Sequence, residues 1–164
     1  MNIDPARAER ALEEGKALLR GAPRNAAFTP LCQWLRKGFP QYNWVGVYLL
    51  EGQELSLAAW DGENATEHTT IPLAMGICGM AAREKRTINV KDVRKRPEYL
   101  ACFLETRSEI VVPIMDGRTC LGEIDIDGKT EGAYDASDES FLERLAVELV
   151  PFARAELRSS SSRA

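Results

Sequence analysis

Hydrophobic positions near the start of the chain repeat at helical intervals. After the helix-start pair Asp4-Pro5, apolar residues spaced three and four apart predict an amphipathic helix to about Arg20. The breaker Gly21-Ala22-Pro23 ends this helix, and a second one is predicted to about Lys37. Its apolar face consists of Phe28, Leu31, Cys32 and Leu35. We therefore expect Cys32 to be a small buried residue.

The pattern then changes to short runs rich in β-branched and aromatic residues. Asn43 to Leu50 and Leu55 to Trp60 predict a β-hairpin. Alternation along its first strand places Trp44, Gly46 and Tyr48 on one face. Further strands are predicted over residues 67–72, 87–90, 109–114 and 119–127, the last two joined by the turn signal Asp116-Gly117.

Two further helices and a long loop complete the pattern. A short helix is predicted over about 76–83, with Cys78 near its N-terminus, where backbone N–H groups favour a thiolate. The charged, irregular segment 92–106 contains Cys102, and connections of this length are commonly functional loops. A last helix is predicted from about Ser137 to Arg158, bent at Pro151.

This order of elements predicts an α+β fold, with an antiparallel sheet of about six strands flanked by N-terminal and C-terminal helices. The chain has 164 residues, which suits one domain, predicted over 1–158, and 159–164 are expected to form a disordered tail. No apolar run approaches the length of a membrane span, and no signal sequence is apparent. We expect a cytoplasmic protein that does not act at a membrane.

The net charge and the cysteines limit the classes of partner and cofactor that the protein can be expected to bind. The formal net charge of −4, without a basic stripe, argues against nucleic acid and favours a small molecule or a protein. The four cysteines form no C-x-x-C pair, and His68 is the only histidine, so we predict neither a metal site nor a cofactor. In a reducing compartment any disulfide would be transient.

Three carboxylates, Glu123, Asp125 and Asp127, share one face of the strand predicted over 119–127. Such a face is ordinarily solvated. Five short motifs nevertheless occur together here at a specific spacing. They are Asn43 to Tyr48, the Gly-x-Cys-Gly of Gly76 to Gly79, Ala101-Cys102 with its cysteine 24 positions after Cys78, Ser108 to Val111, and Asp125 to Asp127.

Together these motifs closely resemble the GAF domain family and, within it, the free methionine-(R)-sulfoxide reductases. The resemblance implies reduction of free methionine sulfoxide, recycling by a thioredoxin-type reductant, and a homodimer. It assigns the attack on the sulfoxide sulfur to Cys102. It also implies that Glu109, Asp125 and Asp127 hold the substrate and assist proton transfer, while Trp44 and Tyr48 shape the pocket for its methyl-sulfur end.

The sequence departs from the family at two places. Ten positions before Cys78, where the family usually has a resolving cysteine, this chain has His68, which we expect to be a strand residue facing solvent or a neighbour. Phe103 stands where the family tends to have an acid. The sulfenic acid would then be resolved by Cys78, by Cys120 or by an external thiol. Cys78 is the best internal candidate, because a helix N-terminus would keep it partly ionised. The alternative is a non-catalytic GAF module that binds an amino-acid-like or other small ligand.

Overall fold

The computed structural model of the protein describes residues 3–161. Its helices are α1 (Pro5–Gly21), α2 (Phe28–Gly38), α3 (Gly76–Glu84), α4 (Ala136–Glu148) and α5 (Val150–Ser161), with a 3-10 turn, η1 (Val93–Lys95). Its strands are β1 (Trp44–Glu51), β2 (Glu54–Gly62), β3 (Thr70–Pro72), β4 (Ile88–Val90), β5 (Ser108–Asp116) and β6 (Thr119–Gly128). Among these residues, no helix is long and apolar enough to cross a membrane.

The strands form one six-stranded sheet in the order β3-β2-β1-β6-β5-β4, and every pair of neighbours is antiparallel. This confirms the predicted α+β architecture. The β5–β6 hairpin turns at Gly117, whose φ of 61° is readily adopted only by glycine. Pairing of β1 with β6 closes the centre of the sheet and brings the two ends of the chain's β region side by side.

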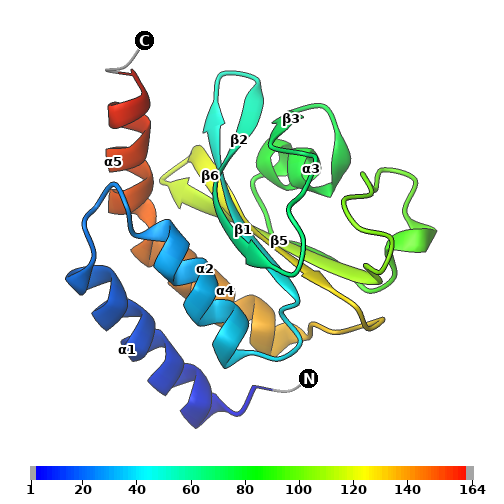
Figure 1. The fold of residues 1–164 in the computed structure, drawn as a ribbon, viewed down its shortest axis with the longest axis horizontal. Coiled ribbons are helices and arrows are strands. Elements are labelled where there is room, and N and C mark those ends of the chain that lie inside the picture. The colour runs from blue at the N-terminus through cyan, green and yellow to red at the C-terminus, as the bar shows by residue number, and fades with distance from the viewer. Residues whose placement is uncertain (1–2, 162–164) are drawn as a thin grey trace.

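The long helices α1, α2, α4 and α5 lie on one side of the sheet (Figure 1). Alternate strand residues point into the core beneath them, as Val45 and Val47 of β1 and Ile124 and Ile126 of β6 do. The large apolar core of the protein lies between this face and the helices. The four long helices therefore pack against this face, and the buried carboxylates lie on the opposite face.

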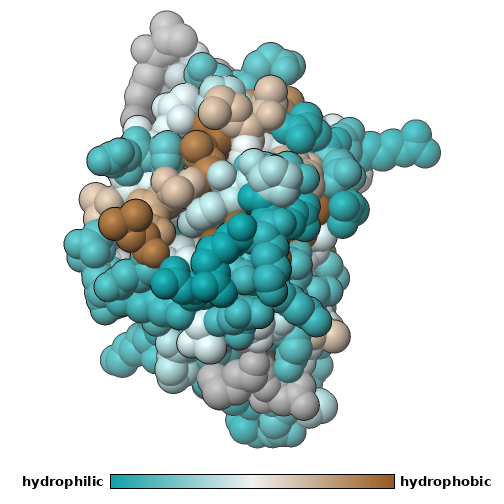
Figure 2. All heavy atoms as spheres, turned by 90° about the vertical axis from the view of Figure 1, so that its right-hand side faces the viewer, coloured by the Kyte–Doolittle hydropathy of each residue, from teal (hydrophilic) through white to brown (hydrophobic). Residues whose placement is uncertain are grey.

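The opposite face is covered by α3 and by the long segment between β4 and β5 (Figure 1). A smaller core forms here between α3 and sheet residues that include Tyr48 and Val111. The same face carries the carboxylates of β5 and β6, so polar and apolar groups are buried side by side. Seen from this side, the surface is mostly hydrophilic, with scattered hydrophobic groups (Figure 2).

Three local predictions need correction. Strand β3 begins only at Thr70, so His68 lies before it in an irregular segment rather than in a strand. The last helix is two helices, because α4 ends at Glu148 and α5 begins just before Pro151, which suits a first turn where no N–H is needed. Helix α5 continues to Ser161, so 159–161 are helical, whereas 162–164 lie outside the described residues.

Candidate functional site

Four carboxylates gather beneath α3 and the long loop. Glu123, Asp125 and Asp127 alternate along β6, and Glu109 of β5 lies directly opposite Asp127 in the strand register. All four are buried, with at most 6% of their surface exposed. The β6 acids therefore do not form the solvated face that is ordinary for such a strand. Alternation predicts which side they share, but only tertiary packing decides whether that side is covered.

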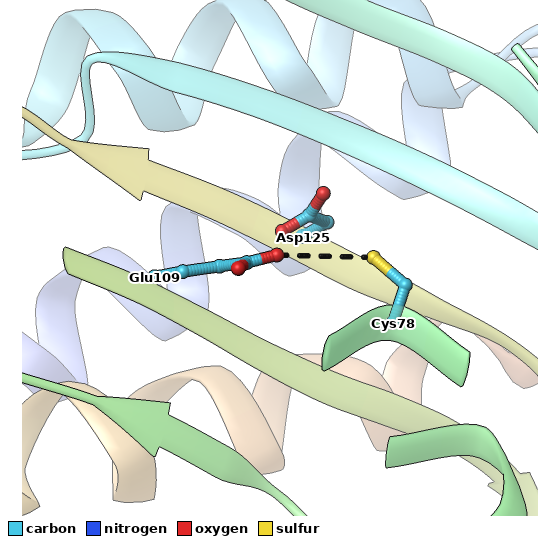
Figure 3. A group of neighbouring side chains, drawn as sticks. All are labelled: Cys78, Glu109 and Asp125. Carbon is cyan, nitrogen blue, oxygen red and sulfur yellow. Dashed lines mark hydrogen bonds between the residues drawn. The ribbon is translucent and has the colours of Figure 1, made fainter. Parts of the chain in front are cut away.

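Cys78 projects from α3 toward these acids (Figure 3). Its Sγ lies 4.0 Å from Oε1 of Glu109, and one ligand atom from each of Cys78, Glu109 and Asp125 lies within 4.8 Å of the others. Burial raises the pKa of the Cys78 thiol, and the charges of Asp125 and Glu123 raise it further. The predicted thiolate at this helix N-terminus is thus wrong, because desolvation and neighbouring acids oppose the favourable helix dipole.

The pKa values of these acids lie above their ordinary values. Burial, reinforced by the charge of Asp125, raises the pKa of Glu109 and Asp127, and burial raises that of Asp125 to about 6. Several carboxylate oxygens in the described structure meet no hydrogen-bond donor: Oε2 of Glu109, both of Glu123, Oδ1 of Asp125 and both of Asp127. Buried polar atoms without partners destabilise the fold, so this arrangement suits a ligand that brings donors and positive charge.

The Cys78, Glu109 and Asp125 cluster is compact enough to surround a small cation. Metal binding requires a deprotonated thiol, however, and burial opposes deprotonation of Cys78. An organic ammonium needs only the carboxylates and supplies the donors that they lack. We therefore do not identify these residues as metal ligands.

Cys102 lies on the loop between β4 and β5 and is half-buried, unlike the three other thiols. The loop folds over the start of α3. A Cβ placed on Gly76 would lie 3.2 Å from Leu100, and Nη2 of Arg96 approaches Sδ of Met80 at 3.5 Å. Burial, followed by the charges of Asp125 and Asp127, raises the pKa of Cys102. Cys78 and Cys102 thus share Asp125 and Glu109 as carboxylate neighbours.

His68 connects the sheet to this loop. The hydroxyl of Tyr48 donates to the backbone oxygen of His68 at 2.8 Å. The Nε2 atom of His68 lies 3.1 Å from the carbonyl oxygen of Ala101, so the ring donates from Nε2 to the residue before Cys102. The sequence contained no signal for this contact between residues 33 positions apart. Tyr48 is buried, and its hydroxyl already donates to the backbone oxygen of His68.

Trp44 forms an apolar wall beside the acids. Its ring lies over Gly46 and Gly62, where any Cβ would approach it to 2.4 Å and 2.3 Å, so both positions require glycine. It stacks on Trp60 at 6.3 Å between centroids and packs against Phe103 at 5.7 Å. A pocket opens at this wall. Its lining includes Trp44, Phe103, Thr106, Asp127 and Lys129.

The structure therefore brings the predicted site residues together: Trp44, Tyr48, Cys78, Cys102, Glu109, Asp125 and Asp127. Sequence reasoning missed Glu123, although its alternation with Asp125 was visible. It also left out Thr106 and named Phe103 only as a departure from the family, because a loop has no periodicity from which to infer direction. Cys32 is in the helical core as predicted, and the Cys120 thiol donates to the carbonyl oxygen of Gly122.

Comparison with known proteins identifies the fold family. A sequence model of the GAF domain matches residues 22–149, most of the chain. The chain belongs to the GAF domain family. This GAF domain is 45% identical over 109 residues to the free methionine-R-sulfoxide reductase of Saccharomyces cerevisiae. The match covers 63% of this chain but only 59% of the yeast protein, less than two thirds of its length.

Solved structures resemble this GAF domain over almost its whole length. The free methionine-R-sulfoxide reductase of Neisseria meningitidis, in complex with its substrate, superposes with a TM-score of 0.85 at 30% identity, covering 97% of this chain and 96% of that one. The type II free methionine-R-sulfoxide reductase of Thermoplasma acidophilum gives 0.75 at 36% identity, covering 88% and 96%.

Proposed function

We propose that this GAF domain protein reduces free methionine-(R)-sulfoxide to methionine. The observation that carries the proposal is the group of buried carboxylates without donors, set between two thiols and an aromatic wall. The named relative and the two solved reductases support it, because they share this chain's fold and up to 45% of its residues over the aligned segment.

Each part of the site suits one part of this substrate. The ammonium of a free amino acid would donate to Glu109, Asp125 and Asp127 and compensate their charge. The aromatic faces of Trp44 and Phe103 would contact the polarizable sulfur and its methyl group. The aromatic wall and the carboxylates meet at the mouth, where Trp44 and Asp127 line the same pocket.

In the proposed reaction Cys102 attacks the sulfoxide sulfur. The sulfoxide is reduced by two electrons to methionine, its oxygen passes to Cys102, and the thiol becomes a sulfenic acid. A protonated acid must assist the oxygen, and burial, which raises the pKa of Glu109 and of Asp127, favours the protonated form of these acids. An incoming ammonium would also favour the Cys102 thiolate by offsetting the negative charge of Asp125 and Asp127.

The last part of the proposed reaction regenerates the two thiols. Cys78 condenses with the sulfenic acid, releasing water and forming a Cys78 to Cys102 disulfide, which a thioredoxin-type dithiol then reduces. The loop that carries Cys102 already covers the start of α3, and disulfide formation requires Cys102 to approach Cys78 until the two Cα atoms are within about 7 Å. The homodimer stays a prediction from the resemblance, and the cytoplasmic location stays a prediction from the sequence. Sedimentation velocity would test the first of them.

The first prediction concerns the free ammonium. N-acetylation removes its charge and two of its three donors, so N-acetyl methionine sulfoxide should react with a kcat/KM lower by roughly 30-fold or more, the scale of a lost charged hydrogen bond of about 2 kcal/mol. The assay follows methionine or N-acetylmethionine by chromatography under one supply of dithiol. The methyl ester, which keeps the ammonium, is the control. Equal rates on the free and N-acetylated substrates would contradict ammonium recognition by the acids.

A second candidate function, non-catalytic binding of an amino-acid-like ligand, has one observation in its favour. Burial raises the pKa of both Cys78 and Cys102, so without a ligand neither thiol is poised as a nucleophile. Binding of methionine sulfoxide without formation of methionine would favour this candidate.

A further inference from the structure

His68 lies between the sheet and the loop that joins β4 to β5. Two hydrogen bonds hold its backbone: the hydroxyl of Tyr48 donates to its carbonyl oxygen at 2.8 Å, and its own N–H donates to Oγ1 of the buried Thr66 at 3.0 Å. The next residue is also tied to the sheet, because the N–H of Leu57 on β2 donates to the carbonyl oxygen of Thr69 at 2.8 Å. The ring of His68 therefore extends from a fixed backbone.

This ring is hydrogen-bonded to the loop. Its Nε2 atom lies 3.1 Å from the carbonyl oxygen of Ala101, the residue directly before Cys102. A carbonyl oxygen only accepts, so Nε2 of His68 carries the proton and donates it to this bond. In the part of the chain that the structure describes, the other backbone hydrogen bonds of residues 99–103 stay within the loop. The bond from His68 thus joins the backbone of this stretch to the rest of the protein.

Apolar contacts hold the same stretch on either side of Cys102. Leu100 lies against α3, where a Cβ placed on Gly76 would be 3.2 Å from it, and Phe103 packs against Trp44 at 5.7 Å between ring centroids. Apolar contacts are non-directional, so they restrict where the loop lies but not which way its peptide groups face. A hydrogen bond prefers one direction, and so it can fix that orientation.

The orientation of one peptide group determines where the Cys102 thiol lies. A peptide group is planar and includes the next Cα, so a bond that fixes the carbonyl oxygen of Ala101 also fixes the Cα of Cys102. Tyr48, which holds the backbone of His68, lies on β1, and β1 is paired with β6, the strand that carries the buried acids. The thiol and the acids are therefore positioned from neighbouring strands of one sheet.

We propose that His68 is a positioning residue that orients the Cys102 thiol for attack on the sulfoxide, through its hydrogen bond to Ala101. This inference rests on the proposed function and deepens it by adding a residue that contacts neither the acids nor the substrate. The role requires an N–H donor but no proton transfer, because the acceptor is a backbone carbonyl. Glutamine, whose amide N–H has a similar reach and does not titrate, should therefore replace the histidine.

Three variants test this role in single turnover. His68→Ala removes the donor, His68→Gln retains one, and Glu67→Gln is the matched control at the exposed neighbouring position. Reduced protein is mixed with increasing free methionine sulfoxide, and methionine is followed by rapid quench. In His68→Ala we expect the limiting rate to fall by about 10-fold or more, with a half-saturating concentration within about twofold of the parent, because the binding groups remain. His68→Gln and Glu67→Gln should stay within about threefold of the parental rate.

Alkylation of the thiols gives a second readout that does not depend on turnover. Burial raises the pKa of the Cys102 thiol, so a loop released into water should present a more reactive thiolate. Iodoacetamide followed by peptide mass spectrometry should therefore modify Cys102 about 10-fold faster in His68→Ala than in the parent or in His68→Gln. Cys32, which is buried in the helical core, should stay unmodified and reports any unfolding.

Distinct outcomes separate this inference from the proposed function. Either a parental limiting rate or a parental rate of Cys102 alkylation in His68→Ala would overturn the role of His68. A limiting rate in His68→Gln as low as in His68→Ala would also overturn it, because glutamine keeps the donor and loses only the titratable ring. Absence of methionine from the parent protein would instead overturn the proposed function, and alkylation would still decide whether His68 holds the loop.

Alkylation of Cys32 would reveal an unfolded His68→Ala. His68→Asn then decides, because its side chain is shorter and its amide falls short of Ala101. Slow methionine formation and fast Cys102 alkylation in folded His68→Asn would support the proposal, whereas parental rates of both would contradict it.

Discussion

Cys102→Ser is expected to lower the turnover of free methionine sulfoxide by roughly three orders of magnitude or more, the scale on which removal of a nucleophile acts. A hydroxyl cannot take up the sulfoxide oxygen as a sulfenic acid does, so even the first turnover should fail. The fold should persist, because Cys102 is half-buried on a loop and donates only a long contact to the carbonyl oxygen of Leu100. Chromatography of methionine after a single mixing gives the result.

Two cysteine variants provide the comparison. Cys78→Ser should still yield about one methionine per protein but lose cycling supported by a dithiol, because only the resolving thiol is gone. Cys120→Ser should retain cycling, since that thiol bonds to a backbone carbonyl at the far end of β6. Full activity in Cys102→Ser would overturn the assignment of the nucleophile to Cys102.

Asp125→Asn and Asp127→Asn are expected to lower kcat/KM by roughly 30-fold each, because each removes a charged hydrogen bond worth about 2 kcal/mol in the transition state. Both residues are buried near Cys102, and each has at least one carboxylate oxygen that accepts no hydrogen bond. Steady-state kinetics with free methionine sulfoxide measures the loss. Asp116→Asn, at the far hairpin turn of β5, is the control and should react at the parental rate. Activity within twofold of the parent in Asp125→Asn and Asp127→Asn would contradict a substrate role for these acids.

The ionisation of Asp125 should also make the stability of the fold depend on pH. Asp125 has a folded-state pKa of about 6, above its ordinary value of 3.8, so the folded protein binds this proton more tightly than the unfolded chain does. The contribution of Asp125 therefore favours the fold at low pH and is lost as pH rises from about 4 through 6. Asp125→Asn should remove this part of the decline, as urea unfolding at several pH values would show.

The sequence predicted most of the fold because its signals are local. The Asp4-Pro5 start, the alternation from Trp44 to Leu50 and the Asp116-Gly117 turn each act within a few residues, and the structure confirms the elements that they predict. The break between α4 and α5 was only partly visible, because Pro151 fits either a bend or a new first turn.

The candidate site was less accessible to sequence reasoning because burial is a tertiary property. Alternation placed Glu123, Asp125 and Asp127 on one face, but the cover supplied by α3 and the loop decides that they are desolvated. The state of Cys78 was mispredicted for the same reason, since its helix terminus is local and its acidic neighbours are not. Nothing in the local sequence around His68 indicated its contact with Ala101.

The most direct measurement of the central claim is methionine formation from separately prepared epimers of free methionine sulfoxide, with the reduced protein as the only thiol source. The proposed function predicts about one methionine per protein from the R epimer within a single turnover, sustained turnover once a thioredoxin-type dithiol is added, and essentially none from the S epimer. No methionine from the R epimer, with the protein folded and its thiols reduced, would contradict the proposed activity.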